Sequence, residues 1–171
     1  MAMALILCAM AIPQVNAGLE RSRTAVAARY LAAEMALARA QAVKRSANVA
    51  IRFGDRASGF EMSVFVDGNR NGVRVRDIVA GIDRRIRPAE RLEQKFPGVT
   101  INVAPESGVD GGPVRFGQSD LLSFSSVGTA TPGSVYVLGR DGSQFVVRVV
   151  GATARTRVLR FIPAKRIWTD S

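Results

Sequence analysis

Met1-Ala-Met-Ala-Leu-Ile-Leu-Cys-Ala-Met-Ala-Ile-Pro13 opens the chain, and together with the segment that continues to Arg45 it decides the fold. The twelve residues before Pro13 carry no charge. As a helix they would be about 18 Å long, whereas the hydrocarbon core of a bilayer is about 30 Å thick. The run is therefore too short to cross a membrane by itself.

Three interpretations of this run compete. A cleaved signal peptide needs a basic residue before the apolar core, and none is present, although Val15-Asn16-Ala17 resembles a cleavage site. A buried core helix needs a partner surface on every side, which a strand-rich remainder supplies on one face only. The third interpretation is the C-terminal half of a longer membrane segment, and it is favoured by the residues that follow.

Residues 18–45 are rich in Ala, Leu, Arg and Glu, which are strong helix formers. An apolar stripe recurs at steps of three and four, at Val26, Tyr30, Ala33, Leu37 and Ala40. The opposite face carries charges, at Arg21, Glu34, Arg39 and Lys44. The pattern predicts an amphipathic helix that packs through its apolar stripe and ends near Arg45, with a kink at Pro13, where a backbone hydrogen bond is lost.

Composition limits the remaining possibilities. With 171 residues, the chain has room for one head domain after the helix, and 47% hydrophobic residues indicate a packed core. The one cysteine, Cys8, excludes an internal disulfide. The chain has no histidine, which removes Ser-His-Asp and Cys-His catalysis and histidine metal ligation. Carboxylates such as Asp55 and Glu61 are scattered. We expect neither an enzyme nor a cofactor.

After Arg45 the sequence predicts short strands joined by turns. Phe60, Met62, Val64 and Val66 alternate along one face of a strand, and Val73–Arg76 alternates again, which predicts a hairpin across Asp67–Gly72. Residues 82–88 are expected to form an exposed arm. Further strands are predicted at 48–53, 98–103, 114–116, 121–125, 134–138, 143–150 and 155–162. The class predicted is α+β, with two packed antiparallel sheets, one of them covered by the helix.

Asp67, Asn69, Asn71 and Gly72 match the first half of an EF-hand calcium loop. The twelfth position is Ile78, where a calcium loop needs a glutamate, and no helix is expected on either side. Asn-Gly and Asp-Gly pairs favour tight turns for backbone reasons alone. We interpret the segment as a structural turn, with a cation on Asp67, Asn69 and Asn71 as the weaker alternative.

Four features in this order are similar to the minor pseudopilins and minor type IV pilins of the GspH/FimT type. They are the apolar segment ending in Ala-Ile-Pro13, the helix motif Met35–Arg45, the turn motif Phe65–Gly72, and Leu122–Gly133 followed by a basic last strand. The resemblance covers nearly the whole chain. It implies a long helix whose first half lies in the membrane or filament core, followed by a β-rich pilin head.

The family begins with a short leader, a Gly-Phe-Thr-Leu-x-Glu motif and the first half of the membrane helix, and none of these precedes Met1. Either the natural start lies upstream or the processing signal has been lost. We expect the first, because half a membrane span has no evident use. The second would put in doubt both leader-peptidase processing and the glutamate that guides subunits into a filament.

The resemblance implies three regions: the end of a transmembrane and filament-core helix (1–15), an amphipathic helix that packs on the head (16–46), and a β-rich head (47–171). The membrane and filament residues would include Leu5, Ile6, Leu7, Ile12 and Pro13. The implied function is that of a non-catalytic subunit of a type II secretion pseudopilus or a type IV pilus. The implied location is the bacterial inner membrane, with the head in the periplasm, and the implied partners are other pilins or pseudopilins.

The chain is strongly basic, with 24 Lys and Arg against 14 Asp and Glu and a net charge of +10. Such a surplus indicates attraction to a polyanion. Basic residues gather near the C-terminus, at Arg140, Arg148, Arg155, Arg157, Arg160, Lys165 and Arg166.

Arg155 and Arg157 alternate along the last predicted strand and should share one face, with Arg160 on the other. Lys165, Arg166 and Trp168, whose ring would stack on a base, complete a candidate DNA-binding patch. The other interpretation is that these charges solubilise an edge strand. Some pilus-associated members of the family bind DNA through arginines near the C-terminus, so the resemblance implies DNA uptake as the alternative function.

Overall fold

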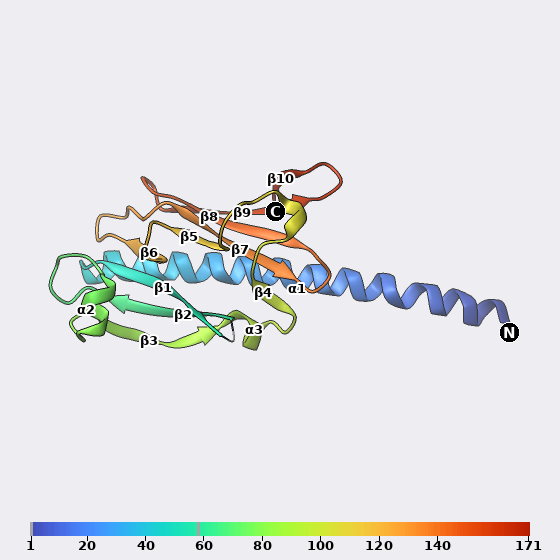
Figure 1. The fold of residues 1–171 in the computed structure, drawn as a ribbon, viewed down its shortest axis with the longest axis horizontal. Helices are drawn as coiled ribbons and strands as arrows, with labels where there is room; N and C mark the ends of the chain where they lie inside the picture. Colours follow the sequence, from blue (N-terminus) through green and yellow to red (C-terminus); the bar gives the residue numbers. More distant parts are fainter. Residues whose placement is uncertain (1, 58) are drawn as a thin grey trace.

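The computed structural model describes the backbone of residues 2–57 and 59–171 and the side chains of residues 18–57 and 59–171. The first helix, α1 (Ala2–Arg45), has 44 residues and continues through Pro13 to the predicted end at Arg45. Its N-terminal half projects from the head as a rod (Figure 1). Leu5, Ile6, Leu7, Cys8, Ile12 and Pro13 lie outside the residues whose side chains are described. Among the described residues, no helix is long and apolar enough to span a bilayer.

The head follows as strands with short helical turns. In chain order its elements are β1 (Val49–Arg56), β2 (Gly59–Val66), α2 (Val75–Val79), β3 (Arg84–Arg91), α3 (Leu92–Lys95), β4 (Val99–Ile101), the 3₁₀ turn η1 (Pro105–Ser107), β5 (Val114–Phe116), β6 (Leu121–Phe124), β7 (Gly133–Gly139), β8 (Gln144–Val150), β9 (Arg155–Ile162) and β10 (Ile167–Asp170). Across the described residues they form two antiparallel sheets, ordered β3-β2-β1-β6 and β10-β9-β8-β7-β4, with β5 also paired to β7. The predicted α+β class with two antiparallel sheets is confirmed.

The C-terminal half of α1 lies between the two sheets (Figure 1) and contacts strands of both, including β1 and β6 on one side and β7, β8 and β9 on the other. The expectation that the helix covers one sheet was therefore wrong. Beside the helix the sheets meet directly, with the rings of Phe53 and Phe116 stacked 5.7 Å apart. Small side chains on α1, such as Ala27, Ala28 and Ala42, are fully buried and let the backbone sit deep in this core.

The predicted packing face of α1 was also wrong. The buried face consists of residues that are at most 2% exposed: Ala27, Ala28, Leu31, Met35, Ala38 and Ala42. Of the predicted stripe, Val26 and Leu37 are 47% and 44% exposed, and only Tyr30 is half-buried. Both stripes recur at helical spacing, because α1 is apolar on two faces. Periodicity revealed the helix and did not show which face meets the head.

The predicted hairpin partner of β2 does not form. Residues 73–76 turn into α2, and β2 pairs with β1 on one side and β3 on the other. The cause is Asp83, whose carboxylate accepts hydrogen bonds from the backbone N–H groups of Gly68 (3.1 Å) and Arg74 (2.9 Å). These bonds fold the chain back on itself after β2. The predicted arm at 82–88 instead contributes to an edge strand, and the tail after Pro163 forms β10.

Candidate interaction surfaces

The outward face of α1 is apolar and uncovered along the head. Val26, Leu37 and Val43 are 47%, 44% and 52% exposed, and the exposed Ala33 and Ala40 lie between them. We call these five residues the outward face. Contiguous exposed apolar surface of this kind marks interaction sites in soluble proteins.

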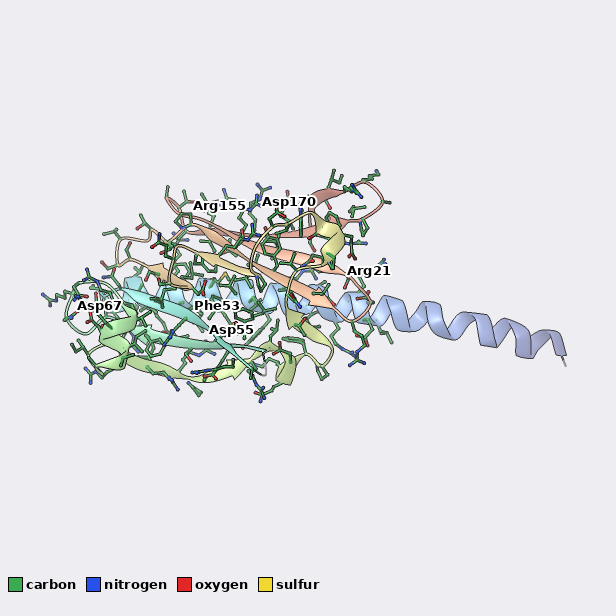
Figure 2. The ribbon with its side chains drawn as sticks, viewed as in Figure 1. Arg21, Phe53, Asp55, Asp67, Arg155 and Asp170 are labelled. Atoms are coloured by element: carbon green, nitrogen blue, oxygen red, sulfur yellow. The ribbon has the colours of Figure 1, made fainter. Side chains whose placement is uncertain are left out.

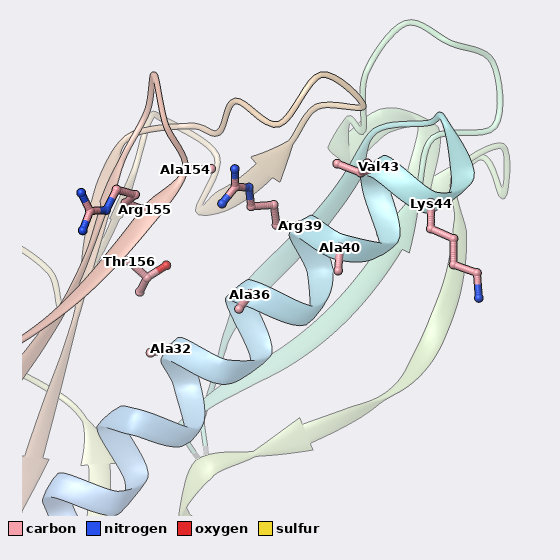
Figure 3. Close-up of a pocket in the computed structure, with 9 residues that line it drawn as sticks. All are labelled: Ala32, Ala36, Arg39, Ala40, Val43, Lys44, Ala154, Arg155 and Thr156. Carbon is pink, nitrogen blue, oxygen red and sulfur yellow. The ribbon is translucent and has the colours of Figure 1, made fainter.

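A groove of about 760 Å³ runs along this side of α1, between the helix and the start of β9. Figure 3 shows Ala32, Ala36 and Ala40 along successive turns of the helix, with Ala154, Arg155 and Thr156 across from them. Small residues four apart form a shallow track in which a second helix can approach closely. The groove lining also contains Arg39, Lys44 and Arg155, and no carboxylate.

On the side of α1 away from the groove, charged groups bind the helix to the first sheet. The Arg87 guanidinium on β3 donates two hydrogen bonds to the Glu34 carboxylate, which raises the pKa of Arg87. Beside this pair, Tyr30 Oη donates to Glu90 Oε2 over 2.8 Å, and Lys95 Nζ donates to Tyr30 Oη over 2.9 Å and also pairs with Glu90.

Burial raises the pKa of the Glu90 carboxyl, but the hydrogen bonds from Lys95 and Tyr30 outweigh burial and hold it below its ordinary value. Because Arg87 and Glu90 both lie on β3, these contacts tie the edge strand of the first sheet to the helix. One flank of α1 is thus held by the head, whereas the outward face has no such cover among the described residues.

The candidate DNA residues are not brought together into one patch. Arg155 and Arg157 are both exposed on β9, whereas Arg160 is half-buried and lines a different pocket together with Arg21. Arg157 forms an ion pair with Asp170 at 2.6 Å. Lys165 and Arg166 lie in the exposed turn before β10.

Trp168 is held by its neighbours, with its ring 5.8 Å from that of Tyr136 and 5.1 Å from that of Phe161. The ring belongs to a small aromatic cluster on the second sheet and is half-buried there. It would have to leave this cluster to stack fully on a base.

Sequence reasoning missed the neighbours of Arg157. The strand register places Arg148 on β8 directly opposite it, and Ser134 and Arg115 continue the same row on β7 and β5. The Arg115 guanidinium lies 5.3 Å from the centre of the Tyr136 ring. Strand alternation predicts which residues point outward, but the cross-strand register that forms this row is not visible in the sequence.

The Asp67 turn is held by its own backbone. One Asp67 oxygen accepts from the N–H groups of Asn69 (3.1 Å) and Arg70 (2.7 Å), and the other accepts from Gly72 N–H and the Asn48 amide, both at 2.8 Å. Burial raises the pKa of Asp67, but these four bonds outweigh it and hold the pKa below its ordinary value.

A cation at this turn would compete with four donors for the Asp67 carboxylate. The side-chain oxygen of Asn69 accepts from Asn71 N–H at 3.3 Å. In the part of the chain that the structure describes, no group of three or more acidic or cysteine side chains is placed to hold a metal ion.

Comparison with known proteins gives two matches. A family model described as type II transport protein GspH matches residues 27–154. Among solved structures, the minor pseudopilin EpsH from the type 2 secretion system of Vibrio cholerae superposes with a TM-score of 0.52 at 12% identity, covering 81% of this chain and 97% of that chain. No curated protein matches the sequence. The family match ends just before β9, so it does not bear on Arg155, Arg157 and the residues after them.

Proposed function

Because the chain belongs to the GspH family of type II transport proteins and has the fold of a minor pseudopilin, we propose that it is a non-catalytic structural subunit of a type II secretion pseudopilus. In this proposal the segment 1–15 is the C-terminal part of a helix that lies in the inner membrane before assembly and in the filament core afterwards. The head lies in the periplasm.

The observation that carries the proposal is the outward face of α1. Fully burying a Val or Leu side chain stabilises an association by roughly 1.5–3 kcal/mol. Val26, Leu37 and Val43 are about half exposed, so each has part of this energy still to gain. The alanines between them allow a second helix to pack closely. A helix of a neighbouring subunit, laid along this face, would cover the apolar surface that the head leaves open.

The cations that line the groove indicate what charge the neighbouring helix should carry. Arg39, Lys44 and Arg155 line the groove and have no ion pair among the described residues. A neighbouring helix with small apolar residues on one side and carboxylates at its margin would match both the track and the charges.

A secretion assay in the parent bacterium tests this proposal. Leu37→Glu places a charge on the outward face, and we expect loss of secretion with the protein still present at its normal level. Val79→Glu is the matched control, because Val79 is 79% exposed on α2, away from the helix. Normal secretion by the Leu37→Glu strain, or equal loss with Val79→Glu, would contradict an assembly role for this face.

The row formed by Arg115, Arg148 and Arg157 favours a second candidate function, DNA binding by the outer face of the second sheet. Arginines on adjacent strands can neutralise successive phosphates, and such binding weakens steeply with salt. Fluorescence anisotropy of the full chain in detergent with a labelled duplex, at low and at physiological salt, tests it. We expect salt-dependent binding that Arg148→Gln/Arg157→Gln weakens; no binding at low salt would remove this candidate.

A further inference from the structure

Two of the motifs singled out in the sequence meet at the end of the head farthest from the start of α1. Residues 70–74 are the end of the Asp67 turn and the two residues after it, and residues 123–132 are the end of β6 and its connection to β7. Together with Asn48 they line a depression of about 620 Å³. Figure 2 shows Asp67 at this end of the molecule, with the projecting part of α1 at the other end. We call this depression the tip pocket.

The first wall of the tip pocket is cationic. Arg70 and Arg74 belong to its lining, and both residues are exposed. Among the described residues, neither guanidinium has a hydrogen bond or an ion pair. The lining contains no carboxylate that would neutralise them.

The backbone of the loop that carries these arginines is held by hydrogen bonds. Asp67 binds the backbone N–H of Arg70, and Asp83 binds the backbone N–H of Arg74. Arg70 has a φ of +64°, a left-handed conformation that is uncommon for a residue other than glycine. Such conformations persist where the surroundings fix them, and they cluster at binding sites. The two aspartates thus hold the backbone of the loop and leave the guanidinium groups unpaired.

The second wall supplies hydroxyl groups. Ser125 Oγ and Thr129 Oγ1 are hydrogen-bonded at 2.7 Å, and Thr131 Oγ1 accepts from Ser123 N–H at 3.4 Å. Each hydroxyl can both donate and accept, and the amides of Asn48 and Asn71 in the lining can do the same. The tip pocket therefore offers positive charge on one side and mixed hydrogen-bonding groups on the other.

We propose that the tip pocket binds a polypeptide segment through the carboxylate of an acidic side chain. Arg70 and Arg74 would hold the carboxylate, because a guanidinium matches its planar geometry with two parallel hydrogen bonds. The hydroxyls and amides would pair with the peptide groups on either side of it. The site lies near the groove along α1, because Gly128 in the loop after β6 lies beside the Arg39 guanidinium, but the linings of the two sites share no residue. The proposal therefore does not rest on the filament contact.

A polypeptide fits the tip pocket better than a nucleic acid does. Single-stranded nucleic acid is usually held by bases stacked on aromatic rings, and the lining contains no aromatic residue. The depression is open to solvent, and its volume of about 620 Å³ lies within the range of ligand-binding clefts. It suits one acidic side chain with its flanking peptide groups.

Fluorescence anisotropy of the full chain in mild detergent tests the proposal. The probe is a short labelled peptide of alternating glycine and glutamate with an amidated C-terminus, and its matched peptide, also amidated, carries glutamine in place of glutamate. We expect the acidic peptide to bind and the neutral peptide not to bind. Arg70→Gln/Arg74→Gln should weaken binding by about tenfold or more, since hydrogen bonds to charged groups are lost.

The control variant removes the same charge elsewhere. Arg29 and Arg140 are exposed and do not line the tip pocket, so Arg29→Gln/Arg140→Gln should bind the acidic peptide as the unchanged protein does. Arg70→Lys/Arg74→Lys keeps the positive charge but lacks the planar guanidinium. Its affinity for the acidic peptide should lie between those of the unchanged protein and the Arg70→Gln/Arg74→Gln variant. Urea unfolding of each variant shows that the fold is retained.

Three outcomes would overturn the proposal. Equal binding of the neutral peptide would show that the carboxylate is not recognised. An equal loss of peptide binding in the Arg29→Gln/Arg140→Gln control variant would show that the peptide is attracted by the net charge of the protein and not by the tip pocket. Binding of a labelled oligothymidine that depends on Arg70 and Arg74, without binding of the acidic peptide, would make the tip pocket a nucleic-acid site.

Discussion

The inward and outward faces of α1 have nearly the same composition and opposite surroundings. The inward face, with Leu31 and Met35 at its centre, is at most 2% exposed between the two sheets. The outward face, with Leu37 and Val43, is about half exposed beside a groove with a cationic rim. The head thus covers one apolar face of α1 and leaves the second exposed, and in the proposed function a neighbouring subunit covers the second face. Substitutions on the two faces should therefore affect different properties of the protein.

The largest effect is expected at the inward face. Leu31→Ala should lower the free energy of unfolding by about 2–5 kcal/mol, since it leaves a cavity in a close-packed core. Urea unfolding of the full chain in mild detergent, followed by the fluorescence of Trp168, measures this. Leu37→Ala is the comparison, and it should cost within about 0.5 kcal/mol because the site is exposed. Similar costs at the two positions would remove the distinction between the faces.

A smaller effect is expected where the flank of α1 is tied to β3. Glu34→Ala removes both hydrogen bonds to the half-buried Arg87 and should cost about 1–3 kcal/mol. Because the lost contact joins helix and edge strand, hydrogen exchange in β3 should also become faster. Gln41→Ala, at another half-buried position of α1, is the control for general disturbance of the helix. Unchanged exchange in β3 would show that the strand does not depend on this pair.

The Asp67 turn gives a further comparison, away from both faces of α1. Asp67→Asn keeps one acceptor oxygen and replaces the other with an NH2 group, so two of the four hydrogen bonds are lost, and it should cost about 1–3 kcal/mol near neutral pH. The pKa of Asp67 lies below its ordinary 3.8 in the folded protein. The charge therefore contributes stability at pH values above about 4, and this contribution is lost as the pH falls through the lowered pKa.

The difference in unfolding free energy between the Asp67→Asn variant and the unchanged protein should accordingly be constant from pH 5 to 8. Below about pH 4 it should shrink. Urea unfolding at several pH values measures this difference. A difference that grows as the pH falls would contradict the stated direction of the pKa shift.

The smallest effect is expected at the exposed pair of Arg157 and Asp170, whose side chains are 58% and 66% exposed. Asp170→Asn should change stability by no more than about 1 kcal/mol, since exposed ion pairs are screened by water and salt. If DNA binds to the outer face of the second sheet, the same variant should bind it more tightly, because Arg157 is released. Weaker DNA binding by Asp170→Asn would contradict that placement of the DNA site.

Much of the fold was predictable from local pattern. Alternation in 60–66 correctly placed Met62 and Val64 in the core, and the boundaries of β9 matched the predicted 155–162. The hairpin at 73–76 failed because Asp83, nine residues beyond Arg74, binds the backbone of the loop through its side chain, which strand alternation does not reveal. The buried face of α1 was misassigned because two apolar stripes of equal period compete, and only the shape of the surrounding sheets distinguishes them.

The surfaces were less predictable than the fold. The exposure of Arg155 and Arg157 followed from strand alternation. The row that includes Arg148 depends on the register between β8 and β9. The packing of the Trp168 ring against Tyr136 and Phe161 depends on β10, which was not predicted. The tip pocket depends on two loops about 50 residues apart meeting in space. Each loop looked like an ordinary turn, because a turn motif does not show what it faces.

Site-specific photo-crosslinking from the outward face tests the central claim most directly. A photoreactive benzoylphenylalanine replaces Leu37 in the parent bacterium, and Val79, which is 79% exposed on α2, serves as the control position. The account predicts that irradiation links the Leu37 position to another pseudopilin of the same system, identified by mass spectrometry, and that the Val79 position gives little or none of this adduct. No adduct from position 37, or equal amounts from both positions, would contradict the assignment of the outward face as the assembly surface.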